Sequence, residues 1–156
     1  MSDTEPQELP AESRFGEAIS ILNRAAHIYM TRRLEQFDLG PGQQAYLLTL
    51  SVETSVTQEE VARRHQVDKA NAARALQSLE RKGYVVRRPG SADRRERLVA
   101  LTERGETVRR EVQTILTEWI ATLADTVNER EWAVTLSALE RMAGAAMDAA
   151  RGTPPA

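Results

Sequence analysis

The sequence predicts a mainly α-helical protein with one small β-hairpin. Apolar residues recur at spacings of three and four near both ends of the chain, which is the period of an amphipathic helix. In the middle, two shorter helical segments with capping residues precede two β-branched segments that flank a basic loop. The 156 residues are enough for one compact domain, which we place at residues 13–150.

The two ends of the chain are predicted to be tails. Residues 1–12 contain two prolines and four acidic residues without hydrophobic periodicity, so we expect them to be disordered, and we expect the same of 151–156. Segment 1–12 also lacks the basic start and apolar centre of a signal peptide, and no apolar run approaches the roughly 18 residues of a membrane span. We therefore expect a cytoplasmic protein that has no contact with a membrane.

A long helix is predicted over residues 14–37, with apolar residues on two of its sides. A chain this short has one lobe with which to cover one side, so the other side is a candidate contact between subunits. One stripe contains Phe15, Ala18, Ile19, Leu22, Ala25, Ala26 and Tyr29, and the other contains Ile21 and Ile28.

The next segment predicts a helix-turn-helix. Pro41 suits the first turn of a short helix, where its missing N–H would have no partner in any case. Thr57 and Glu60 have the spacing of a capping box at the start of another helix. After a three-residue turn, Asp68 can cap a second helix, which Gly83 ends. Two capped helices joined by so short a turn form a helix-turn-helix.

Two strand-like segments follow this motif. Segments 84–88 and 97–101 are rich in β-branched residues and predict a hairpin whose loop, 89–96, is basic. Helix, turn, capped helix and hairpin in this order make a winged helix-turn-helix, here a DNA-binding lobe of residues 38–104.

Two further amphipathic helices are predicted after the hairpin. Thr102 caps the first, and Asn128 with Glu131 begins the second. Their apolar stripes carry no polar groups that could do chemistry, so we interpret them as core and dimer contacts. With the first helix they form a dimerisation lobe of residues 13–37 and 105–150. The stripes contain Val108, Val112, Ile115, Leu116, Trp119, Ile120 and Leu123, and then Trp132, Leu136, Leu139, Ala143 and Ala146.

The distribution of charge predicts a polyanionic partner. The chain has a net charge of -2, but residues 57–104 contain twelve basic and seven acidic side chains, which leaves -7 for the remainder. The second helix of the motif could enter the major groove of DNA, where Asn can pair with adenine and Arg with guanine. The residues predicted to read bases or contact phosphates from this helix are Lys69, Asn71, Arg74 and Gln77.

The hairpin loop adds a second predicted contact with DNA. A loop beside the groove-reading helix can enter the neighbouring minor groove, where negative potential attracts a guanidinium group. Asp93 lies two residues from Arg95 and can hold that side chain extended, which leaves the other arginines for phosphates. The residues predicted for the wing are Arg87, Arg88, Asp93, Arg94, Arg95 and Arg97.

The runs "DKANAARALQSLERKGYVVR" and "DRRERLVALTERG", with the flanking long helices, resemble the multiple-antibiotic-resistance regulator (MarR) family from about Phe15 to Ala146. The resemblance implies a homodimer, with the first and last two helices interlocked, that places two winged lobes on a pseudo-palindromic operator. It assigns the positioning and minor-groove roles to Asp93 and Arg95. It also implies a repressor that a small phenolic or other aromatic anion releases from double-stranded DNA. Where relatives often have hydroxyl residues, this chain has Ala70, Ala72 and Ala73, so operator sequence does not transfer.

A site for such an effector is predicted on the first two helices. A cation beside aromatic rings suits a carboxylate, and these helices carry His27, Met30, Arg33 and Tyr46. Each of these also has a structural interpretation, since a lone His on a helix and a Met or Tyr near the core are common in proteins without ligands.

Other chemistry is excluded by the residues available. The chain has no cysteine and only two histidines, far apart in sequence, so we predict no disulfide, no metal site and no cofactor. Without a paired nucleophile and base or a Gly-rich phosphate loop, we predict that the protein is not an enzyme. The alternative to a DNA-binding regulator is a winged-helix module that contacts other proteins and binds no operator.

Overall fold

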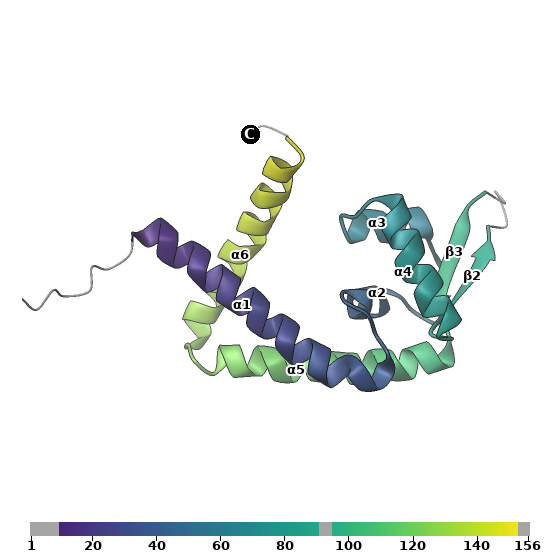
Figure 1. Ribbon diagram of the computed structural model, residues 1–156, viewed down its shortest axis with the longest axis horizontal. Helices are drawn as coiled ribbons and strands as arrows, with labels where there is room; N and C mark the ends of the chain where they lie inside the picture. Colours follow the sequence, from purple (N-terminus) through teal and green to yellow (C-terminus); the bar gives the residue numbers. More distant parts are fainter. Residues whose placement is uncertain (1–9, 91–94, 153–156) are drawn as a thin grey trace, which may run out of the picture. The chain divides into compact units, whose positions relative to one another are not determined.

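The computed structural model describes residues 10–90 and 95–152 (Figure 1). The chain divides into two compact units, Met1–Leu116 and Thr117–Ala156. The predicted mainly helical fold with a hairpin wing is confirmed, and the wing proves to be part of a three-stranded sheet. Among the residues described, none of the helices combines the length and the apolar character needed to span a membrane.

The first unit begins with a helix that starts and ends three residues earlier than expected. Helix α1 spans Ala11–Leu34 and is followed by the 3-10 turn η1, Glu35–Phe37. It therefore starts inside the segment that was expected to be a tail. Residues 1–9 of that segment and 153–156 at the other end lie outside the described residues. Leu34 is the one buried residue among those of α1. The first halves of the predicted stripes are exposed in the single chain, as Phe15 and Ile28 show, whereas Ala25, Ala26 and Tyr29 are half-buried and Tyr29 packs against the core.

Helix α2, Gln43–Thr49, starts later than the sequence indicated. Pro41 lies in a turn and not in the first helical turn, because Gly42 takes a left-handed conformation, with φ of +76°, directly before Gln43. Only a residue without a Cβ adopts this conformation at little cost.

The helix-turn-helix consists of α3, Gln58–Arg64, and α4, Lys69–Arg81. The hydroxyl of Thr57 accepts from the N–H of Glu60 at 3.1 Å, as predicted, but the Glu60 carboxylate does not complete the predicted box and instead accepts from Arg63 and Arg64. Asp68 caps α4 and accepts from the N–H of Asn71 at 2.8 Å, as predicted.

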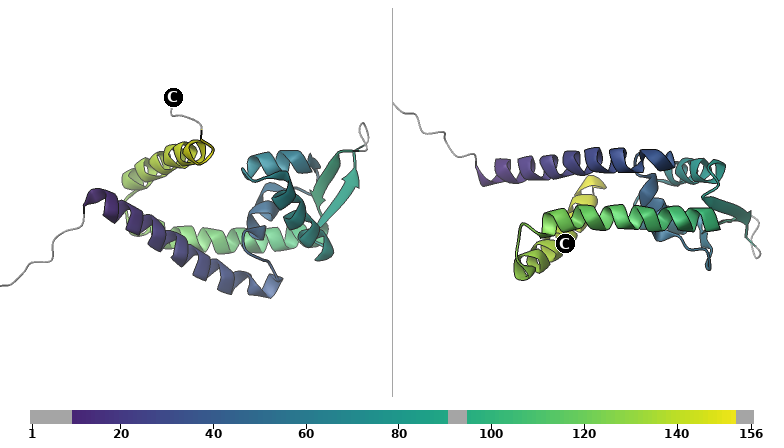
Figure 2. Two further views of the ribbon diagram at one scale, coloured as in Figure 1. Left: turned by 45° about the horizontal axis from the view of Figure 1, so that its top comes forward. Right: turned by 90° about the horizontal axis from the view of Figure 1, so that it is seen from below.

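The sheet has the strand order β1-β3-β2 and is antiparallel throughout. Strands β2, Val85–Pro89, and β3, Arg97–Leu101, form the predicted hairpin. Strand β1, Val56–Thr57, was not predicted from the sequence, because two residues give no alternating pattern. In the three views of Figures 1 and 2 the hairpin lies beside α4.

The core of the first unit lies between α2, α3, α4, the sheet and the first half of α5, Glu103–Ala124. Thr102 caps α5 by accepting from the N–H of Gly105 at 3.0 Å, as predicted. Gly105 packs so closely on the backbone of Tyr84 that a Cβ would lie 1.9 Å from its carbonyl oxygen. The largest fully buried side chains are Leu47, Val61, Leu76, Leu79, Val99 and Val112.

The second unit contains the end of α5 and helix α6, Glu129–Ala150. The predicted capping box at its start is confirmed, since Asn128 and Glu131 each bond the other's backbone N–H at 2.9 Å. Of the described residues of α6, none is buried, and Leu136 and Leu139 of its predicted stripe are exposed.

Candidate nucleic-acid interface

Helix α4 has a buried side and a polar exposed side. Ala72, Leu76 and Leu79 are buried against the core. The opposite side exposes all four residues that were predicted to contact DNA, which are Lys69, Asn71, Arg74 and Gln77.

Three residues on this exposed side are linked in a chain of hydrogen bonds. The side-chain amide of Asn71 donates to Oδ2 of Asp68, and its Oδ1 accepts from Nη2 of Arg74. Both ends of the amide are therefore engaged within α4, and Asn71 would have to change partners to pair with adenine. In this structure its oxygen instead contacts the guanidinium group of Arg74.

A shallow hollow of about 420 Å³ separates the helix-turn-helix from β3. Lys69, Arg95 and Arg97 line it, and the Lys69 ammonium group lies 2.7 Å from Oε1 of Glu59. Both partners are more than two-thirds exposed, and an ion pair of this kind contributes little to stability, so Lys69 can exchange it for a phosphate. The predicted wing residues Asp93 and Arg94 lie outside the described residues.

Arg87 and Arg88 lie on opposite faces of the sheet, because successive residues of a strand alternate. Arg88 is exposed and lines a hollow on the outer face with Val86 and Leu98. Arg87 instead binds Glu80 of α4, with 2.7 Å between its Nη2 and Oε2 of Glu80. The two arginines, which the sequence had grouped together, therefore have different surroundings.

The C-terminal end of α4 is attached to the connection between α1 and α2. The Lys82 ammonium group donates to the carbonyl oxygen of Asp38 and to Oε1 of Gln43, the latter at 3.1 Å. The hydroxyl of Tyr84 donates to the carbonyl oxygen of Phe37 at 2.9 Å. Sequence analysis missed these contacts because they join residues about forty positions apart.

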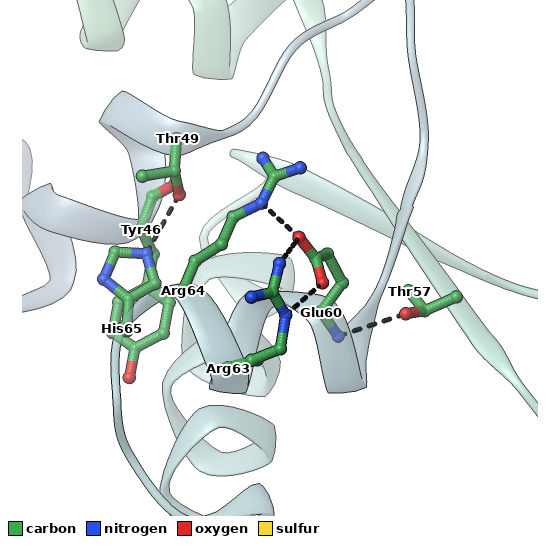
Figure 3. Close-up of polar contacts among 7 residues, drawn as sticks. All are labelled: Tyr46, Thr49, Thr57, Glu60, Arg63, Arg64 and His65. Atoms are coloured by element: carbon green, nitrogen blue, oxygen red, sulfur yellow. Dashed lines mark hydrogen bonds and ion pairs between the residues drawn. The ribbon is translucent and has the colours of Figure 1, made fainter.

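Helix α3 contributes two arginines that share one carboxylate (Figure 3). Arg63 donates to Glu60 through Nε and Nη2, both at 2.8 Å, and Arg64 donates through Nε at 2.7 Å. These hydrogen bonds, from Arg63 first and then from Arg64, lower the pKa of Glu60 to about 2. Arg63 is largely exposed, but the two arginines of α3 are balanced by Glu59 and Glu60 of the same helix.

His65 lies at the end of α3 and packs on α2 (Figure 3). Its ring centroid is 4.4 Å from that of Tyr46, and its Nε2 is 2.9 Å from the hydroxyl of Thr49. The same hydroxyl also lies 3.0 Å from the carbonyl oxygen of Tyr46, and which group donates in the contact with His65 depends on the tautomer of the ring. Burial, and then the charge of Arg64, lower the pKa of His65, while burial raises that of Tyr46.

The residues predicted to bind an effector are not all brought together. His27 and Met30 line a hollow of about 320 Å³ between α1 and the segment 39–44. Arg33 instead lies over the ring of Tyr29, one helical turn earlier, with its guanidinium carbon 5.6 Å from the ring centroid. Tyr46 packs on His65 and is not among the residues that line the hollow.

The helix-turn-helix, the three-stranded wing and the basic exposed side of α4 define a winged helix-turn-helix protein. The chain belongs to the MarR family of transcriptional regulators, which are not enzymes. The family's model matches residues 37–96, from the end of η1 to the residue before β3.

Individual relatives agree with this assignment. A MarR transcriptional regulator from Methanosarcina mazei Go1 has a solved structure that is 31% identical, with a TM-score of 0.75 over 87% of this chain and 98% of that one. The uncharacterized HTH-type transcriptional regulator YybA of Bacillus subtilis (strain 168) is 31% identical over 90 residues, which are 58% of this chain and 60% of that protein. The chain thus matches about three-fifths of this relative's length.

One solved neighbour shares the fold in complex with DNA. The structure of the S. aureus MepR–DNA complex is 23% identical and has a TM-score of 0.78 over 88% of this chain and 99% of that one. At this identity the match is one of fold.

Proposed function

We propose that this protein is a dimeric transcriptional regulator that binds double-stranded DNA with sequence specificity. The observation that carries the proposal is the exposed side of α4, which is polar and basic along its first turns and lies beside a basic wing. A helix of this kind fits the major groove, and a neighbouring wing then reaches the minor groove or the phosphates. The structure of the S. aureus MepR–DNA complex, which shares this fold, supports the proposal that the chain binds DNA.

Specificity in this proposal rests mainly on Arg74 and Gln77, and affinity on the cations around them. Arg74 is held in place by Asn71 and can pair with a guanine. Lys69 and Arg95 line the same hollow, where a phosphate or the edge of a minor groove would meet two positive charges. Asp93 and Arg94, outside the described residues, retain their predicted wing roles as part of the proposal.

Dimer formation is supported by apolar surface that the single chain leaves exposed. On α1, Phe15, Ile19 and Leu22 follow a helical spacing of four and three and are each more than 40% exposed. On α6, Leu136, Leu139 and Met142 follow a spacing of three and are also more than 40% exposed. A second copy of the chain would bury both stripes and place two α4 helices on a pseudo-palindromic operator.

The proposal includes repression that is relieved by a small aromatic anion. The hollow between α1 and segment 39–44 has the volume for one small molecule, and His27 and Met30 offer a polar group and an apolar wall. A regulator of this kind acts where the DNA is, which for this protein means the cytoplasm.

The test is fluorescence anisotropy of the purified protein with a duplex from its own upstream intergenic region and with a scrambled duplex. We expect the upstream duplex to bind at least tenfold more tightly than the scrambled duplex. Typical DNA-binding proteins prefer their specific site by roughly a thousandfold or more, so this threshold is a low one. If both duplexes bind equally, the measurement is repeated with fragments selected from the whole genome. Equal affinity for these fragments and for the scrambled duplex would contradict the proposal and favour the protein-interaction module.

A further inference from the structure

Glu80 and Arg87 join the recognition helix to the wing. Oε2 of Glu80, in the last turn of α4, accepts from Nε of Arg87 at 2.8 Å and lies 2.7 Å from its Nη2. Oε1 of the same carboxylate accepts from the backbone N–H of Arg87 at 3.2 Å. One carboxylate thus holds both the side chain and the main chain of β2.

This pair joins two separate elements, as the pairs of Lys82 with Asp38 and of Lys69 with Glu59 also do, and differs in this from the other ion pairs described in the first unit. Glu60 and Glu106 bind arginines three and four residues away on their own helices, so they connect no separate elements. The Lys69–Glu59 pair is more than two-thirds exposed, whereas Arg87 is only 22% and Glu80 35% exposed. Two guanidinium nitrogens of Arg87 share Oε2 of Glu80, and a charge-assisted contact of this kind is stronger than a neutral hydrogen bond.

The position of β2 in the sheet explains why this contact matters. The strand order β1-β3-β2 leaves β2 at an edge, where it has β3 on one side only. The unpaired backbone groups of an edge strand need partners from outside the sheet, and a side chain that supplies one attaches the strand to its own element. Glu80 binds the free edge of β2, where the backbone N–H of Arg87 donates to the Glu80 carboxylate and not to another strand.

We propose that Glu80 and Arg87 are positioning residues for DNA binding, which fix the wing against α4 before DNA is met. The inference rests on the proposed function, since it concerns how two DNA-contacting elements are held. A wing that is already oriented loses less conformational freedom on binding, and the affinity rises accordingly. Arg87 acts here through Glu80 and not as a phosphate ligand.

The proposal predicts that neutralising Glu80 changes the affinity for DNA in the direction opposite to that expected from charge alone. Glu80 is an acidic residue near a polyanion, so electrostatics alone predicts that its neutralisation strengthens DNA binding. If Glu80 orients the wing, Glu80→Gln weakens binding instead, by roughly tenfold, because the wing must then be ordered during association. Glu53→Gln is the matched control, because it removes one negative charge from an exposed loop residue. The hydrogen bond that the structure describes for Glu53 is with Ser51 and not with the wing strands. We expect the control to bind as tightly as the parent or slightly more tightly.

Variants of Arg87 separate positioning from phosphate binding. Arg87→Lys keeps the charge but loses the planar fork, so it should weaken binding about as much as Glu80→Gln. Arg87→Ala should show the same log–log slope of affinity against salt concentration as the parent. If Arg87 were a phosphate ligand, its loss would make the slope less steep by about 0.9. The exchanged pair, Glu80→Arg with Arg87→Glu, should bind more tightly than either single charge reversal.

Three measurements are needed. They are fluorescence anisotropy over a series of salt concentrations with the selected duplex, meaning the one that the parent binds most tightly, thermal unfolding, and amide hydrogen exchange of the DNA-free protein. We expect a small fall in the melting temperature of Glu80→Gln, without loss of folding, and faster exchange in its β2 and β3. Affinity of Glu80→Gln equal to or above that of the parent, or a reduced salt slope in Arg87→Ala, would overturn the inference. If the parent binds no duplex, the proposed function fails, and hydrogen exchange still decides whether the pair holds the wing.

Discussion

The side-chain oxygen of Gln43 accepts hydrogen bonds from both Lys82 and Gly40. Oε1 of Gln43 accepts from the Lys82 ammonium group at 3.1 Å and from the N–H of Gly40 at 3.0 Å. Lys82 caps the recognition helix, and Gly40 lines the hollow proposed for an effector. One side-chain oxygen thus joins the C-terminal end of α4 to a residue that lines this hollow.

Loss of this attachment should destabilise the protein. Lys82→Met keeps the length of the side chain but removes its hydrogen bonds to Asp38 and Gln43. We expect the free energy of unfolding in urea to fall by about 1–3 kcal/mol, the usual range for hydrogen bonds to a charged group. Arg81→Met, at the exposed neighbouring position, is the control and should change it by less than about 0.5 kcal/mol. Equal effects of the two substitutions would show that the attachment contributes nothing.

Arg74 and Arg95 should differ in what their removal does to DNA binding. Arg74→Ala should relax the preference for one base pair in each half-site, by about 1–3 kcal/mol of discrimination. Arg95→Ala should weaken binding to all duplexes with little change in preference, because its contact is with groove shape or phosphate. Affinities for a set of single-base operator variants measure both effects. Two substituted proteins that bind like the parent would refute the groove assignments.

Protonation of His65 should lower the stability of the protein. Its pKa is lowered by burial and by Arg64, so below its ordinary value of 6.5 the unfolded chain binds more protons than the folded one. Stability is therefore fully present above about pH 6.5 and falls as the pH drops below it. His65→Gln should remove this part of the pH dependence of the melting temperature. An NMR titration gives the pKa directly, with His27→Gln to assign the two imidazole signals; a pKa at or above 6.5 would contradict the burial described.

Gly105 should not tolerate a side chain. In Gly105→Ala the new Cβ would lie 1.9 Å from the carbonyl oxygen and 2.8 Å from the carbonyl carbon of Tyr84, and backbone atoms cannot move aside cheaply. We expect a loss of at least about 3 kcal/mol in the free energy of unfolding, or failure to fold. Gly144→Ala, in a helix with no atom within 4 Å of the new Cβ, should instead stabilise by roughly 0.5–1 kcal/mol. A mild effect at Gly105 would mean that α5 does not pack on Tyr84 as described.

The exposed stripe of α6 should be needed for the dimer. Leu136→Glu with Leu139→Glu places two charges on the side of α6 that we propose a second chain covers. Sedimentation velocity should show the parent at the mass of two chains and this variant at the mass of one. Val52→Glu, which alters an equally exposed apolar residue of the first unit, should remain dimeric. A dimeric α6 variant would remove the stripe from the interface.

The parts of the fold that sequence reasoning predicted well have local signals. Asp68 and Asn128 cap helices within three residues, and the hairpin follows from two β-branched segments close together. The start of α2 was misplaced because the left-handed conformation of Gly42 overrode the preference of Pro41 for a first helical turn. Spacing along a helix could have warned that Arg33 folds back onto Tyr29, four residues earlier, and not towards an effector.

The contacts that sequence reasoning missed depend on the tertiary fold. Lys82 reaches Asp38 across 44 positions, and nothing in either segment marks the other as its partner. The pairing of Arg87 with Glu80 joins a helix to a strand, where no fixed spacing applies. A cluster of arginines in the sequence therefore predicted a basic surface but could not separate the arginines that face solvent from the one that holds the wing.

The salt dependence of DNA binding tests the central claim most directly. Affinity for the selected duplex, measured by anisotropy from about 50 mM to about 300 mM salt, should fall with a log–log slope between roughly -5 and -9, as expected for about 6 to 10 phosphate contacts. A slope near zero, or no measurable binding at the lowest salt, would contradict the assignment of α4 and the wing as a DNA-binding surface.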